Sequence, residues 1–123
     1  MTRTAAQEVV LRDVMDQWKS AVDAHEPEKI AVLFTEDAIF QGLHPYSVGR
    51  RGVAEYYDSQ PLGLRAAYEV LETRSPAEDV LLGYLGVVFS FTDRPDIHVT
   101  LSIVLRRLAD QWSISHYQVT RLG

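Results

Sequence analysis

The sequence contains no cysteine, and this absence excludes disulfides, thiolate metal sites and cysteine nucleophiles at once. Basic residues are also few: 12 Lys and Arg stand against 17 Asp and Glu, which gives a formal net charge of −5. Arg50-Arg51 and Arg106-Arg107 are the only basic pairs, and neither builds a patch. Nucleic acids and anionic membranes need a basic surface, so neither is an expected partner.

Long apolar runs and the common cofactor motifs are missing as well. No window approaches the roughly 18 apolar residues of a membrane span. The N-terminus "MTRTAAQEVV" lacks the pattern of a signal peptide, and we expect a cytoplasmic protein. There is no phosphate-binding loop, GxSxG elbow, HExxH or dinucleotide fingerprint. His25, His44, His98 and His116 share no helix turn or strand face, so we expect no metal site and no cofactor.

What is present predicts one globular domain over residues 1–123, with 46% hydrophobic and 24% charged residues. Val10, Val14, Trp18 and Val22 recur every four residues, which indicates an amphipathic helix that ends near Ala24. Pro27 suits the first position of a second, short helix that includes residues 30–34. A third helix is expected over 50–60, before Pro61, with a short strand over 37–42 between the two.

Strand patterns follow the helices along the chain. Residues 66–74, 80–91, 98–108 and 111–120 read as strands separated by tight connections. Helices first and long antiparallel strands afterwards predict an α+β fold with the helices on one face of the sheet. Long strands must coil, and Gly83, Gly86 and Ser90 allow sharp bending. A strongly curved sheet with helices on its concave side would enclose a cavity.

The last strand, "QWSISHYQVT", leaves one question open. Side chains alternate between the two faces of a strand, so Trp112, Ile114 and His116 share one face, and Ser115 and Tyr117 share the other. Each set mixes polar and apolar residues. Alternation alone therefore does not say whether His116 points into the cavity, where it would be the obvious catalytic base.

Three segments carry a resemblance to a known superfamily: "QWKSAVDAHEPEKIAVLFTEDAIFQG", "GRRGVAEYYDS" and the hairpins that end in "QWSISHYQV". They look like the nuclear transport factor 2-like superfamily, which includes ketosteroid isomerase, SnoaL-like polyketide cyclases, scytalone dehydratase and a kinase association domain. Small actinobacterial proteins labelled SgcJ/EcaC-like are the most similar branch. The resemblance implies a cone-shaped, cystatin-like α+β barrel with three N-terminal helices on the concave face of a mainly antiparallel sheet. It also implies one deep apolar pocket and a homodimer through the outer sheet face.

The resemblance also suggests an answer for the last strand. In relatives with a comparable strand, Ser115, Tyr117 and Val119 would line the pocket. Ile114, His116 and Gln118 would lie on the outer face and contribute to a dimer. A β-bulge would reverse this assignment.

The comparison with ketosteroid isomerase argues against that chemistry. The isomerase uses a carboxylate base, a phenol and a protonated carboxylic acid. In this sequence the main phenol falls on Trp18, the base on Gly42 and the acid near Leu101 or Ile103. Only the supporting phenol is retained, as Tyr57. The acid and histidine of the polyketide cyclases fall near Val119 and Tyr117, so their aspartate-based mechanism is missing too.

The candidate catalytic residues are therefore His44, Tyr57 and Tyr117, where a loop histidine at the pocket mouth would move protons and phenols would bind an enolate oxygen. A flat, largely apolar ligand fits the rest of the expected lining: Trp18, Phe34, Phe40, Tyr56, Tyr84, Val88, Ile103 and Ser115. The leading hypothesis is a cofactor-independent isomerase, cyclase or dehydratase acting on a polycyclic or aromatic metabolite in natural-product biosynthesis. The alternatives are a non-catalytic ligand carrier and an oligomerisation module of the same fold.

Overall fold

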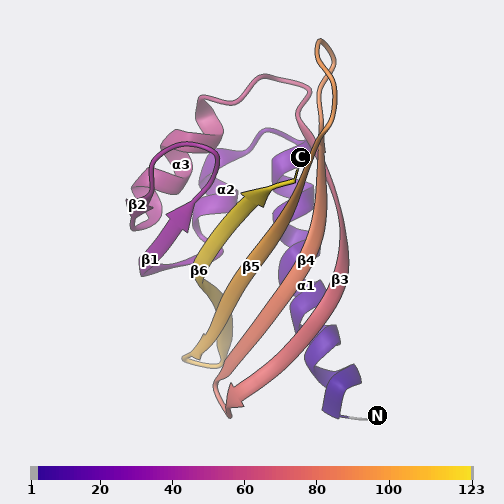
Figure 1. Cartoon of the computed structure of the whole chain (residues 1–123). Coiled ribbons are helices and arrows are strands. Elements are labelled where there is room, and N and C mark those ends of the chain that lie inside the picture. Colours follow the sequence, from indigo (N-terminus) through magenta and orange to yellow (C-terminus); the bar gives the residue numbers. More distant parts are fainter. Residues whose placement is uncertain (1–2, 123) are drawn as a thin grey trace.

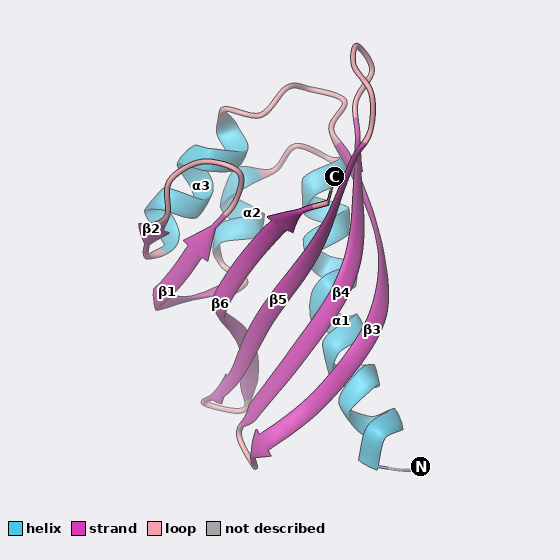
Figure 2. Cartoon of the chain, viewed as in Figure 1, coloured by secondary structure: helices cyan, strands magenta, loops and turns pink. Residues whose placement is uncertain are grey.

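The computed structural model describes residues 3–122 and shows three helices and six strands. In chain order these elements are α1 (Arg3–Asp23), α2 (Pro27–Ala31), β1 (Phe34–Gln41), β2 (Ser47–Val48), α3 (Arg50–Asp58), β3 (Arg65–Ala77), β4 (Val80–Ser90), β5 (Ile97–Leu108) and β6 (Gln111–Arg121). The six strands form one curved sheet in the order β2-β1-β6-β5-β4-β3, and all three helices lie on the same side of it (Figure 1 and Figure 2). Only β1 and β6 pair in parallel. The expected α+β architecture is confirmed.

Helix α1 is uninterrupted because residues 3–23 contain neither proline nor glycine. Its buried face, which includes Leu11, Met15 and Trp18, packs onto the concave side of the sheet. The C-terminal end of α1 is clamped to the start of β3. Asp23 accepts the N–H of Ala66 at 2.9 Å, and Lys19 Nζ donates to the Ala66 carbonyl at 2.6 Å. This clamp fixes where Trp18 enters the interior.

Helix α3 packs against α2 and β1. The backbone enters it through Gly49, whose φ of 93° lies in the left-handed region that favours glycine. The Gly49 N–H donates to the Ala38 carbonyl of β1 at 2.8 Å. The helix then turns Val53, Ala54 and Tyr57 toward the interior. As a result, Tyr57 meets residues of α1 and β6 that lie far from it in the sequence.

Two irregularities interrupt the pairing of β6. Val104 pairs with His116 but Leu105 pairs with Ile114, so Ser115 is an extra residue. On the other side, Phe34 pairs with Ile114 and Ile39 pairs with His116, so residues 35–38 of β1 have no partner in β6. Both irregularities change which side chains face the interior.

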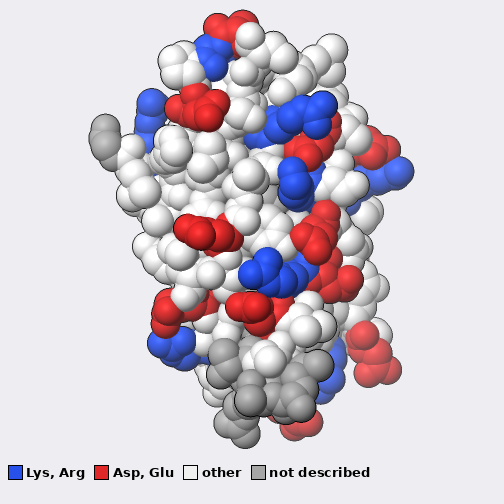
Figure 3. Space-filling model, turned by 90° about the vertical axis from the view of Figure 1, so that its right-hand side faces the viewer, with Lys and Arg blue, Asp and Glu red and all other residues white. Residues whose placement is uncertain are grey.

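Charged residues are distributed without a dominant sign. On the face drawn in Figure 3, basic and acidic side chains are interspersed and form no continuous patch of one charge. Of the described helices, none combines the length and apolar character that a membrane span needs.

Candidate functional site

The interior of the cone is filled by a cluster of aromatic side chains from four elements. Trp18 comes from α1, Tyr57 from α3, Tyr117 from β6, and Phe34 and Phe40 from β1. Each of the five is at most 3% exposed. Phe40 and Tyr117 stack with ring centroids 4.8 Å apart, and Phe34 meets Phe40 edge to face at 5.7 Å. These residues were all predicted to line a pocket, and the structure brings them together.

Two hydrogen bonds join the polar atoms of this cluster. The indole Nε1–H of Trp18 donates to the Tyr57 hydroxyl at 3.2 Å. The hydroxyls of Tyr57 and Tyr117 are 3.2 Å apart, and either one can donate. The cluster has three donor groups, one indole N–H and two hydroxyls, but only two hydrogen bonds. One hydroxyl proton is therefore left over, and no acceptor for it occurs within residues 3–122. The cluster thus has one more hydrogen-bond donor than its own hydrogen bonds use.

Burial keeps both phenols neutral. Removal from water raises the pKa of Tyr57, an effect only partly offset by the hydrogen bonds from Tyr117 and Trp18. Burial likewise raises the pKa of Tyr117 well above its ordinary value, and the neighbouring Tyr57 raises it further. Because neither phenol ionises near neutral pH, both act as hydrogen-bond donors and neither acts as a base.

Tyr56 packs on the outer edge of this cluster and is half-buried. Its ring packs edge to face on Phe40 at 5.0 Å and on Tyr57 at 5.1 Å, and it rests on Gly42. The Leu43 N–H donates to the Tyr56 hydroxyl at 3.4 Å. Burial raises the pKa of Tyr56, and this N–H lowers it in part. The isomerase comparison placed the base at position 42. The ring of Tyr56 fills the space that a side chain at this glycine would take.

His44 lies outside this cluster, on the loop between β1 and β2. Its imidazole is exposed and meets the Tyr56 ring edge to face, with 5.3 Å between the centroids. His44 was predicted at the mouth of a pocket; in the structure it contacts Tyr56, which separates it from the buried phenols. Proton transfer between His44 and the interior would require Tyr56 to move.

Other predicted lining residues divide between the two faces of the sheet. Ile103 is fully buried on the inner face. Tyr84 and Val88 lie on the outer face, so their prediction as pocket residues was wrong. The inner face of β4 carries Gly83, Leu85 and the alternate residues on either side of them, because α1 packs against the sheet at Gly83. Ser115 is the extra residue of the bulge and is half-buried.

The open question about β6 is answered by its bulge. Tyr117 points inward opposite Ile103, and His116 pairs with Val104 and Ile39 on the outer face, as predicted. Ile114 was predicted on the outer face, but it is fully buried inside, opposite Leu105. The alternation reverses at Ser115, so the residues before it have the opposite orientation from the one expected.

The deep pocket implied by the resemblance is closed in this structure. Five surface grooves on the described part of the chain are lined by residues other than the aromatic cluster. Among residues 3–122, no group of three His, Asp or Glu side chains is arranged to hold a metal ion.

Sequence reasoning missed two contacts of this site. It treated Trp18 and Tyr57 as separate lining residues, although they are hydrogen-bonded across 39 positions of sequence. It also interpreted Gly42 as the loss of a catalytic base, and did not recognise that the Tyr56 ring packs against this glycine. The adjacent pair Tyr56-Tyr57 was a usable signal, because neighbouring residues on a helix point about 100° apart and their two rings must therefore meet different surroundings.

Structural comparison identifies the class of fold. A Nostoc punctiforme domain of unknown function with a cystatin-like fold is 20% identical with a TM-score of 0.83, covering 100% of this chain and 80% of that one. A candidate calcium/calmodulin-dependent protein kinase II association domain from Xanthomonas campestris is 16% identical with a TM-score of 0.82, covering 92% and 86%. A ketosteroid isomerase-like protein from Erwinia carotovora atroseptica is 19% identical with a TM-score of 0.81, covering 94% and 95%.

These similarities confirm the resemblance at the level of the fold. The chain has a cystatin-like fold. No protein-family model and no curated protein matches the sequence. Since this fold hosts many unrelated activities, the function has to be argued from the residues of this chain.

Proposed function

We propose that the cone interior is a small-molecule site of the isomerase, cyclase or dehydratase type, and that Tyr56 closes it in the absence of ligand. The observation that carries the proposal is the surplus donor of the Trp18, Tyr57 and Tyr117 cluster. A buried donor without an acceptor costs about 1–3 kcal/mol, and a ligand oxygen at the phenols would recover that free energy. A flat aromatic or polycyclic ketone from secondary metabolism matches both the donor and the surrounding rings.

Such a ligand would take the place of the Tyr56 ring against Phe40. The phenols would then donate to the carbonyl oxygen and stabilise the negative charge that develops there as the substrate enolises. A neutral phenol suits this role because it donates without exchanging its own proton. The proton leaves the carbon next to the carbonyl and goes to a base, for which His44 at the entrance is the candidate. No cofactor is required for this step.

The probe that tests the proposal is α-tetralone, a flat bicyclic aromatic ketone. In heavy water, NMR would follow the exchange of the protons next to its carbonyl for deuterium. We expect the wild-type protein to accelerate exchange, Tyr57→Phe to lose most of the acceleration, and His44→Ala to lose exchange while retaining binding. Leu62→Ala, which removes an exposed side chain outside the cluster, is the control.

The results separate the alternatives. Binding of α-tetralone without exchange in any variant would favour a non-catalytic carrier that uses the same interior. Absence of both binding and exchange, including in a variant with Tyr56 reduced to alanine, would contradict the proposal.

A second candidate function, self-association, is favoured by the outer face of the sheet. Large apolar side chains are exposed there on four strands: Ile39, Val48, Leu82, Tyr84 and, at the β3 irregularity, Leu71. His116 and Gln118 lie on the same face, whereas buried Ile114 cannot contribute. These side chains form one group on β2 and β1 and another on β4 and β3, with β6 and β5 between them, and exposed apolar surface is typical of interfaces. We infer a homodimer through this face, which stable dimers usually build from about 800 Å² per partner.

Light scattering of the purified protein over a range of concentrations tests the dimer. Introducing a charge with Tyr84→Lys should convert a dimer into a monomer without unfolding it. Val9→Lys, at an exposed position of helix α1, serves as the matched control and should leave the dimer intact. A monomer at all concentrations would contradict this second candidate.

A further inference from the structure

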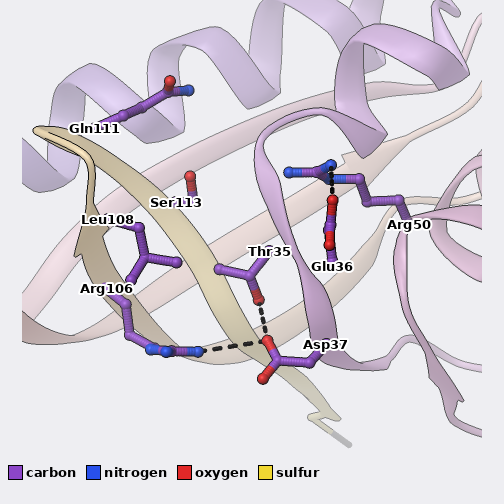
Figure 4. A pocket seen from close by; sticks show the side chains of 8 residues that line it. All are labelled: Thr35, Glu36, Asp37, Arg50, Arg106, Leu108, Gln111 and Ser113. Atoms are coloured by element: carbon purple, nitrogen blue, oxygen red, sulfur yellow. Dashed lines mark hydrogen bonds and ion pairs between the residues drawn. The ribbon is translucent and has the colours of Figure 1, made fainter.

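The sheet borders two hollows of different character. The groove between β1 and the β5–β6 hairpin is bridged by two ion pairs, Arg50 with Glu36 at 3.6 Å and Arg106 with Asp37 at 3.4 Å (Figure 4). Its charges are therefore already matched within the chain. The second hollow has a volume of about 410 Å³, lies over β3, β4 and β5, and is lined mainly by apolar atoms. We call it the glycine hollow, because Gly86 lies in its floor.

Nothing within residues 3–122 explains why position 86 is a glycine. Gly83, on the inner face of the same strand, is required because a Cβ there would lie 2.8 Å from Leu11 Cδ1. A Cβ at position 86 would meet its nearest atom, Glu69 Cγ, at an ordinary 3.6 Å, and the φ angle of Gly86 is not positive. A glycine in a strand interior weakens the strand and often marks a place where another molecule approaches closely.

The same strand carries a side chain that could fill such a hollow. Tyr84 lies on the outer face, is 40% exposed, and packs on no aromatic ring of the described chain. Its ring does not line the glycine hollow of its own chain. All three helices lie on the opposite side of the sheet, so no described element covers this face (Figure 1). Strand β4 thus presents a projecting ring and an empty place about 6.6 Å apart.

We propose that two copies of the chain pack outer face to outer face, with Tyr84 of each copy in the glycine hollow of the other. This inference rests on the homodimer proposed above and specifies its register. A two-fold axis in the interface, crossing β4 at Leu85, places residue 84 of one copy over residue 86 of the other and makes the same contact twice. The two β4 strands then run antiparallel. Packed sheets lie about 10 Å apart, a separation that suits a ring over a glycine better than a ring over a ring.

The rim of the hollow matches the chemistry of a phenol. Leu71 and Val88 line the hollow and offer apolar contacts to a ring. The carboxylate of Glu69 lies beside the floor, since its Oε1 would be 3.7 Å from a Cβ at position 86. It would accept a hydrogen bond from the hydroxyl of the partner's Tyr84, which loses water on association and needs an acceptor. Aromatic side chains that fill a pocket of the opposite surface dominate the affinity of many interfaces.

Two single substitutions, followed by light scattering over a range of concentrations, test this register. Gly86→Tyr sets a ring against a ring, and Tyr84→Ala sets a hollow against a hollow. Each should raise the dissociation constant of the dimer by at least about 30-fold, the effect expected for an aromatic residue at the centre of an interface. An equal mixture of the two variants should form a heterodimer, because both rings of one chain then face both hollows of the other.

Controls separate the register from the fold and from the dimer itself. Circular dichroism should show both variants folded, and Gly86→Leu, which fills the hollow without a second ring, should also dissociate the dimer. An alanine at position 86 would fill only a small part of the hollow. Val9→Tyr adds a ring at an exposed position of α1 and should leave the dimer intact.

The possible failures are distinguishable. A dimer that persists in Gly86→Tyr and Gly86→Leu would leave the homodimer standing but overturn this register. Two monomeric variants that do not associate when mixed would overturn it as well. A wild-type chain that stays monomeric at every concentration would contradict the homodimer, and the register with it.

Discussion

At the scale of single residues, two features organise the site: the missing side chain at Gly42 and the hydroxyl proton of the tyrosine pair that has no acceptor. The ring of Tyr56 rests on Gly42 so closely that a Cβ at position 42 would lie 2.7 Å from Tyr56 Cζ. The sequence shows the glycine but not the ring above it, because 13 residues separate Leu43 from the tyrosine hydroxyl that it contacts. The missing side chain at position 42 therefore determines whether the interior is covered.

Gly42→Ala should displace Tyr56 and uncover the entrance. Overpacking of this kind costs typically about 1–3 kcal/mol of unfolding free energy. We expect lower stability in urea together with increased binding of a hydrophobic fluorescent dye. In the Tyr56→Ala background, the same glycine substitution should cost much less, because the clash is gone. Equal costs in both backgrounds would show that Tyr56 does not respond to position 42.

The two hydrogen-bonded phenols should differ in their effect on stability. Tyr57→Phe removes the partner of both Trp18 and Tyr117, whereas Tyr117→Phe leaves the Trp18 bond in place. A buried donor without a partner costs about 1–3 kcal/mol, so Tyr57→Phe should be more destabilising by about that amount. Urea unfolding of the two variants measures the difference. Equal losses would mean that the indole finds another acceptor.

At the scale of elements, the sequence predicted where helices and strands occur better than which way they face. The signals for α1 and for the turns that bound β4 and β5 are local, and the structure confirms these elements. Strand β1 begins at Phe34, three residues before the predicted start, and the short β2 was not foreseen. The faces of β4 were misassigned because the residues on both faces of this strand are largely apolar. Which face is buried is decided by the packing of α1, which the strand's own sequence does not record. The reversal at Ser115 depends on pairing with β5, which no local pattern records.

Two glycines of β4 test the contact that decides these faces. A Cβ at position 83 would lie 2.8 Å from Leu11 Cδ1 and 3.3 Å from Ile103 Cγ1, both of them fully buried side chains. A Cβ at position 86, on the outer face, would meet its nearest atom at an ordinary 3.6 Å. We expect Gly83→Ala to destabilise the protein by about 1–3 kcal/mol. Gly86→Ala should be neutral or slightly stabilising, since glycine weakens a strand interior. Thermal unfolding of the pair measures the difference, and equal effects would contradict the close packing of α1 on Gly83.

At the scale of the whole molecule, the fold followed from the sequence but the state of its pocket did not. The sequence predicted six aromatic residues around one pocket, and the structure places their rings close together: Trp18, Phe34, Phe40, Tyr56, Tyr57 and Tyr117. Whether such rings line a space or fill it depends on their packing, which composition and periodicity do not encode. Here they fill it, and Tyr56 packs on their outer edge. The same packing leads us to expect that the stability of the protein falls at alkaline pH.

The buried phenols should link folding to pH above the ordinary tyrosine pKa of 10.0. Because burial raises the pKa of Tyr57 and Tyr117, the unfolded chain ionises first as pH rises. The stability that these two neutral phenols contribute is fully present below pH 10.0 and is lost as pH rises through their folded-state pKa. The buried pair should therefore ionise only together with unfolding.

Tyrosinate absorbance and circular dichroism, followed in one alkaline titration, test this linkage. We expect the absorbance change of Tyr57 and Tyr117 to coincide with the loss of secondary structure. Tyr117→Phe should reduce the decline in unfolding free energy above pH 10.0, because one linked phenol is gone. Leu62→Ala, an exposed substitution outside the cluster, should leave the decline unchanged. Ionisation of all the tyrosines in a still folded protein would mean that water reaches the cluster, and the interior would then be open without any ligand.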